Sequence, residues 1–203
     1  MSGQVTIALA GRRRGQAVSG KDHVVAAGAL TWMWGTVQGK VMRVINHAGG
    51  SGHELVLMDG MSPPDVVLVH RAALRVLRSG IDVAHLDAYS DDAWPSAVMH
   101  SYERALLLAR EAVADGTRSR RADPGMGIDI DVRDDAQFEL LLDLAPYVIN
   151  AEGRQRGRLV FGASDSGTSL WIAVTQGQEA ELLSQLESLG IAPTAFALRD
   201  RDR

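Results

Sequence analysis

Short apolar runs alternate with longer segments of helical period through the first part of the chain. Three of the runs, Val5–Ala10, Glu54–Asp59 and Ile81–Leu86, have the length and the β-branched content typical of buried strands. Residues 62–80 begin with a serine cap and two prolines and end on a glycine, so they predict a helix. Residues 91–116 also predict a helix, which begins at Asp91 or Asp92, has Pro95 in its first turn and ends near Gly116. This alternation of strand and helix predicts a parallel sheet with helices on both faces.

The tryptophan-containing stretch between these segments has two interpretations. Between His23 and His47, apolar residues recur every three or four positions, which favours a helix with one buried face. Three glycines oppose a helix, because each costs about 1 kcal/mol relative to alanine. The alternative makes Gly39–Asn46 a strand, paired as a hairpin with Glu54–Asp59. We favour the helix.

The second half of the chain has a different order of elements. Residues 117–126 are polar and rich in turn-forming types, and we interpret them as a linker. Residues 127–203 then predict strand, helix, two strands, helix and strand, which matches a ferredoxin-like α+β sandwich. We therefore expect an α/β protein of two domains: a three-layer Rossmann-like domain over residues 1–116 and a ferredoxin-like βαββαβ domain over residues 127–203.

Composition narrows the classes of function. The 203 residues include no cysteine, which excludes disulfides, thiolate metal sites and cysteine nucleophiles. Residues 127–203 contain seven basic and 13 acidic side chains, a net charge of −6, so we expect no nucleic-acid partner. No uncharged apolar run approaches about 18 residues, and the first residues lack the features of a secretory signal. We expect a cytoplasmic protein without membrane contact.

Candidate binding residues follow the predicted strands. The loop around Arg12 and Arg13, flanked by Gly11 and Gly15, would hold an anion through guanidinium groups and free backbone N–H groups. In a parallel sheet, ligands bind beyond the carboxyl ends of the strands, so we expect further contacts from five residues of the second and third strand ends. These residues are Asp59, Gly60, Ser62, His85 and Asp87.

Asp59 and Asp87 are the candidates for acid–base chemistry or for hydrogen bonds to ribose-like hydroxyls. His85 and Asp87 are two residues apart, so a strand would place both on one face, where they could shuttle a proton or bind a metal. No tight metal-binding spacing occurs in the sequence, so we predict no metal site and identify no cofactor.

Three arginines, at positions 71, 75 and 78, are spaced to form a stripe along the helix predicted over residues 62–80. A solvated helix face is the default interpretation of such a stripe. The alternative is an interface with an acidic surface, such as the C-terminal half of the chain.

The first half of the chain resembles the SLOG-type Rossmann-like nucleotide-binding domains. Residues 5–13, Val-Thr-Ile-Ala-Leu-Ala-Gly-Arg-Arg, carry the likeness at the first strand end, and residues 55–62, Leu-Val-Leu-Met-Asp-Gly-Met-Ser, carry it before a helix. In the second loop, Asp-Gly-Met-Ser replaces the glycine pair of the family. The same segments are similar to those of nucleoside deoxyribosyltransferases. These resemblances imply binding, sensing or N-glycosidic cleavage of a nucleotide or related metabolite.

Three functional hypotheses result. The first is a protein that binds or senses a nucleotide-like or phosphorylated small molecule. The second is a non-enzymatic interaction or adaptor protein with a protein partner, to which the uneven charge and the acidic C-terminal module also fit. The third is a hydrolase or transferase that acts on N-glycosidic bonds of nucleosides or nucleotides. A homo-oligomer is compatible with each of them.

Overall fold

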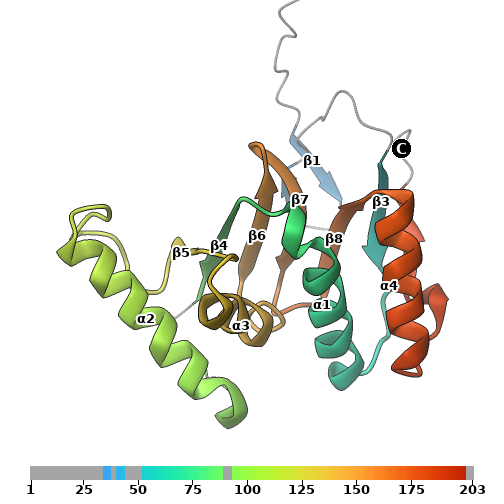
Figure 1. Cartoon of the computed structure of the whole chain (residues 1–203), viewed down its shortest axis with the longest axis horizontal. Helices are drawn as coiled ribbons and strands as arrows, with labels where there is room; N and C mark the ends of the chain where they lie inside the picture. The colour runs from blue at the N-terminus through green and yellow to red at the C-terminus, as the bar shows by residue number, and fades with distance from the viewer. Residues whose placement is uncertain (1–33, 38–39, 44–51, 89–92, 200–203) are drawn as a thin grey trace, which may run out of the picture. The chain divides into compact units, whose positions relative to one another are not determined.

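The computed structural model describes residues 34–37, 40–43, 52–88 and 93–199 (Figure 1). The chain divides into two compact units, Met1–Asn46 and His47–Arg203, which are considered separately.

The described part of the first unit is an antiparallel strand pair. Strands β1 (Trp34–Val37) and β2 (Lys40–Arg43) pair so that Trp34 lies opposite Arg43. The predicted helix is therefore wrong for these residues. Glycine and β-branched side chains disfavour helix here, and this preference outweighs the helical spacing of the apolar positions. The alternative strand at Gly39–Asn46 overlaps β2, but β2 pairs with β1 and not with Glu54–Asp59.

The second unit is built on one open antiparallel sheet of seven strands, in the order β5-β4-β6-β7-β8-β3-β9. Every pair of neighbours is antiparallel. The strands are β3 (His53–Leu57), β4 (Val83–Asp87), β5 (Ile128–Ile130), β6 (Asn150–Gln155), β7 (Arg158–Ser164), β8 (Ser169–Val174) and β9 (Phe196–Leu198).

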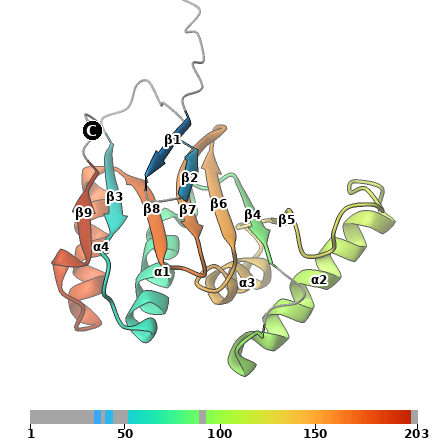
Figure 2. The same cartoon turned by 180° about the vertical axis from the view of Figure 1, so that it is seen from behind.

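Four helices accompany this sheet: α1 (Pro63–Leu77), α2 (Met99–Ala114), α3 (Asp135–Leu144) and α4 (Gln176–Ser188). Helices α1, α3 and α4 lie on one face of the sheet, and α2 extends from the edge beside β5 (Figures 1 and 2). Three short 3-10 turns complete the unit, at Arg78–Gly80, Ser96–Val98 and Pro193–Ala195. No helix in the described ranges is both long and apolar enough to cross a lipid bilayer.

Local sequence signals explain where the helices begin. Ser62 caps α1 by accepting a hydrogen bond from the backbone N–H of Asp65, and two prolines fill the first turn. Asp134 caps α3 through the N–H of Gln137, and Thr175 forms a reciprocal capping box with Gln178 at α4. The helix predicted over residues 62–80 and the two helices predicted within residues 127–203 are confirmed.

The core lies between the sheet and the helix layer. Alternate strand residues point to the helices: Ala84 and Leu86 on β4, and Phe161 and Ala163 on β7, are buried. From α1, Leu74 is completely buried. Both halves of the sequence therefore contribute to one hydrophobic core.

The parallel Rossmann-like sheet is not observed, because the sheet is antiparallel throughout. Strands β6, β7 and β8 form a meander that inserts between β4 and β3. A two-residue turn makes the first hairpin possible, since Arg156 and Gly157 both adopt positive φ, as short hairpin turns require. A meander of this kind has no helical crossover, so it cannot be parallel.

A separate ferredoxin-like sandwich is also not formed. Residues 127–203 supply five strands rather than four, and two strands of the first half lie among them. β4 separates β5 from β6, and β3 separates β8 from β9. Strands on either side of residues 117–126 thus share one sheet, and the division into compact units falls at Asn46 and His47 instead.

The segment interpreted as a linker is organised around Arg118. Its guanidinium group donates hydrogen bonds to the carbonyl oxygens of Asp123 at 2.6 Å and Gly127 at 2.5 Å, and to that of Met126. The loop is also tied to the sheet, because the N–H of Ala88 donates to the carbonyl oxygen of Gly125 at 2.6 Å. These bonds hold residues 117–127 against the end of β4.

Candidate functional site

The predicted anion loop lies outside the described residues. This applies to Gly11, Arg12, Arg13 and Gly15, and to the strand predicted at Val5–Ala10. The assignment of an anion site there stays a prediction.

His85 and Asp87 share one face of β4, as predicted. Ala84 and Leu86 point into the core, so their neighbours point to the opposite face of the sheet. His85 Nδ1 lies 2.6 Å from Asp129 Oδ1 on β5. In the strand register, His85 is also opposite Glu152 of β6. A histidine between two acidic residues thus occupies the β5-β4-β6 part of this face.

Asp87 has two hydrogen bonds that tie the structure together. One carboxylate oxygen accepts from the N–H of Gly127 at 2.5 Å, and the other accepts from the side-chain amide of Asn150 at 3.1 Å. The side chain joins the end of β4 to the start of β5 and to β6. Both oxygens therefore help to hold these strands together.

Asp59, Gly60 and Ser62 lie in the loop between β3 and α1. This loop is near the β9 edge of the sheet, whereas β4 is next to the β5 edge. Ser62 caps the helix, and its hydroxyl donates to the Asp65 carboxylate at 2.7 Å. The strand register makes β3 and β4 run in the same direction, so Asp59 and Asp87 lie near the carboxyl ends of these two strands. Four strand steps separate them, which is about 19 Å. The structure does not bring the two aspartates together.

Two members of the predicted arginine stripe contact α3. Arg71 is 2.6 Å from Asp143, and Arg78 is 2.5 Å from Asp135. Arg78 also donates to the carbonyl oxygen of Val132 at 2.9 Å. The alternative interpretation of this stripe, an interface with the acidic C-terminal half, is confirmed at these two positions.

Asp143 links three helices. One of its oxygens accepts the Arg71 bond from α1, and the other accepts from the hydroxyl of Ser101 on α2 at 2.6 Å. Ser101 is buried. Breaking this set would leave buried polar atoms unsatisfied, so its function is structural.

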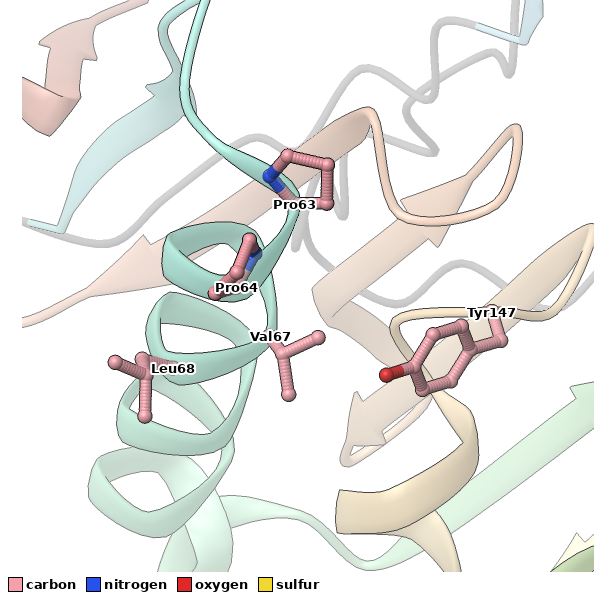
Figure 3. A pocket seen from close by; sticks show the side chains of 5 residues that line it. All are labelled: Pro63, Pro64, Val67, Leu68 and Tyr147. Atoms are coloured by element: carbon pink, nitrogen blue, oxygen red, sulfur yellow. The ribbon is translucent and has the colours of Figure 1, made fainter. Parts of the chain in front are cut away.

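An open groove, which the sequence pattern did not predict, lies beside the start of α1. It has a volume of about 460 Å³ and is lined by Pro63, Pro64, Val67, Leu68 and Tyr147. Figure 3 shows the tyrosine ring across from the helix, with its hydroxyl directed toward Val67. No charged side chain lines the groove. Apolar residues outside the buried stripe of α1 are the sequence signal that could have located it.

His70 is buried in the core rather than in a site. Its Nδ1 lies 2.8 Å from the carbonyl oxygen of Val66, and its ring makes an edge contact with Phe161 at 6.5 Å between centroids. Its Nε2 has no hydrogen-bond partner. Burial lowers the pKa of His70 from 6.5 to about 4, although the bond to Val66 opposes the shift. The imidazole is therefore neutral in the folded protein at neutral pH.

The described residues include no group of three or more histidine, aspartate or glutamate side chains that could hold a metal ion. Comparison with known proteins assigns no family, because no family model, curated protein or solved structure matches this chain.

Proposed function

We propose that this protein is a non-enzymatic, cytoplasmic interaction module whose protein partner inserts apolar side chains into the groove beside α1. The composition of the groove carries this proposal, because its lining is apolar apart from one tyrosine hydroxyl. A nucleotide needs several convergent polar groups, whereas the apolar side chains of a partner need a surface from which water is displaced.

The groove also has the rigidity that favours binding. Pro63 and Pro64 have restricted φ angles, and the Ser62 cap fixes the turn to which they belong. A surface that is already ordered loses little conformational entropy when a partner binds. Tyr147 adds an aromatic ring with one polar atom, a combination enriched in protein interfaces.

The charged residues of the described part give less support to a nucleotide site. Asp87, Arg71 and Arg78 are engaged in bonds within the protein. The binding of a nucleotide-like molecule stays a hypothesis that rests on residues 11–15. Cleavage of an N-glycosidic bond by Asp59 and Asp87 together has no geometric support, because a distance of about 19 Å exceeds the span of one reacting bond.

The test compares groove variants with a matched surface variant. Val67→Asp and Leu68→Asp place a carboxylate in the groove, and Leu189→Asp places one at an exposed leucine at the end of α4. Each protein serves as bait in quantitative affinity purification from the cells that produce it. The proposal predicts a protein retained by wild type and by Leu189→Asp but lost with both groove variants.

Identical retained proteins for all four baits, with circular dichroism showing that all are folded, would overturn the proposal. Calorimetry with nucleoside mono- and triphosphates tests the alternative in parallel. Nucleotide binding that Val67→Asp leaves unchanged would favour the small-molecule hypothesis instead.

A further inference from the structure

Helix α2 presents an exposed side that no described element covers. Its buried residues, Ser101, Tyr102, Ala105 and Ala109, lie toward α3 and β5. Figures 1 and 2 show the helix extending from the edge of the sheet, away from α1 and α4. Within the described part of the chain, the side of α2 opposite these residues is therefore exposed.

A stripe along this exposed side combines apolar and charged residues. It contains Met99, Glu103, Leu107, Arg110 and Ala114, spaced by four, four, three and four residues, which keeps them on one side of a helix. Met99 is 37% exposed and Leu107 is 40% exposed, both high for large apolar side chains. An exposed leucine therefore lies at the centre of the stripe. The negative charge of Glu103 lies on one side of it, and the positive charge of Arg110 lies on the other.

The two charges of the stripe are too far apart to pair within the helix. Glu103 and Arg110 are seven residues apart, which is about 10.5 Å along the axis. Neither has an ion pair among the described residues.

We propose that α2 is the contact surface for a second copy of this chain, which packs its own α2 antiparallel across a two-fold axis between Leu106 and Leu107. This arrangement places Glu103 opposite Arg110 of the second copy, and Arg110 opposite its Glu103. Met99 then faces Ala114, and Leu107 meets Leu107 of the second copy beside the axis, whereas Leu106 packs against the core of its own chain. A two-fold interface uses the same patch twice, so the patch must be self-complementary, and the charge order of this stripe meets that condition.

Apolar contact at the centre supplies affinity, and the two outer ion pairs fix the antiparallel register. This surface is separate from the groove beside α1, so the inference stands or falls independently of the proposed function.

Charge reversal provides the test. Glu103→Arg would place two arginines opposite each other at both outer pairs, and Arg110→Glu would place two glutamates there. Each single variant should dimerise at least about tenfold more weakly than wild type, because two attractive pairs become repulsive. The double variant, with both charges exchanged, should recover the wild-type dimer. Sedimentation equilibrium over a range of protein concentrations measures the dimer dissociation constants of the two single variants and the double variant.

Mixing provides a second, more specific readout. In an equimolar mixture of the two single variants, a heterodimer places arginine only opposite glutamate, so it should form more tightly than the homodimer of either variant. Arg104→Glu and Glu111→Arg reverse charges on the same helix outside the proposed pairs, and they should dimerise like wild type. Wild type that stays monomeric at millimolar concentration would overturn the inference. Single variants that dimerise like wild type, or a mixture that gains no dimer, would overturn it equally.

Discussion

The buried imidazole of His70 makes the stability of this protein depend on pH in a specific range. The side chain is completely buried, and its pKa in the folded protein is about 4, compared with 6.5 for an exposed histidine. As the pH falls below 6.5, the unfolded chain takes up a proton at this position and the folded protein does not. Proton uptake therefore favours unfolding, and stability is lost between pH 6.5 and about 4.

The size of the effect follows from the two pKa values. Each pH unit between them costs about 1.4 kcal/mol, so the full loss from this residue is about 3 kcal/mol. At pH 5 about 2 kcal/mol is already lost. The total stability of a domain is often about 5–15 kcal/mol, so a loss of this size is measurable by ordinary denaturation.

Urea unfolding followed by circular dichroism at several pH values between 7 and 4 measures this loss. His70→Leu removes the titrating group. Between pH 7 and pH 5, the free energy of unfolding of this variant should therefore fall by about 2 kcal/mol less than that of wild type. His100→Leu replaces an exposed histidine of α2 and should keep the wild-type pH dependence, because His70 is still present. If wild type and His70→Leu lost the same free energy of unfolding between pH 7 and pH 5, His70 would not be the source of the pH dependence.

Three further changes test local features of the fold. Gly167→Ala should cost more than Gly157→Ala by about 1–3 kcal/mol in urea unfolding, because both have positive φ but only the Cβ at Gly167 would meet the Pro146 carbonyl oxygen, at 2.4 Å; equal losses would contradict this. Arg118→Met should speed amide hydrogen exchange and proteolysis in residues 117–127 with little change elsewhere, because three carbonyl oxygens lose their donor; unchanged rates would contradict it. Asp143→Asn should lower stability by about 1–3 kcal/mol, because two bonds between helices depend on its carboxylate; an unchanged urea midpoint would contradict it.

The sequence predicted most of the local structure of the second unit. Helix starts at Ser62 and Asp134 depend on contacts within three residues, which a sequence displays directly. Strand β6 was missed because the pattern of Asn150–Gln155 contains no large apolar residue. Ala151 and Gly153 face the core there, and Gly153 has no side chain because a Cβ would come within 2.9 Å of Ile81 Cδ1.

Strand order and direction could not be predicted in the same way. Alternating strands and helices indicate a parallel sheet only when successive strands become neighbours, and here a later meander separates β4 from β3. This difference determines the outcome for the candidate site. His85 and Asp87 share a face because they are two residues apart on one strand, whereas Asp59 and Asp87 depended on a pairing of strands that does not occur.

In this fold, strands from both halves of the sequence form a single seven-stranded sheet. Pulsed electron–electron double resonance between spin labels at Asp129→Cys on β5 and Leu198→Cys on β9 tests this strand order directly. The natural chain has no cysteine to interfere, and both positions are exposed. Six strand steps predict a backbone separation of about 29 Å. In a ferredoxin-like sandwich of residues 127–203, the first and last strands are neighbours, so a separation of about 5 Å would contradict the account.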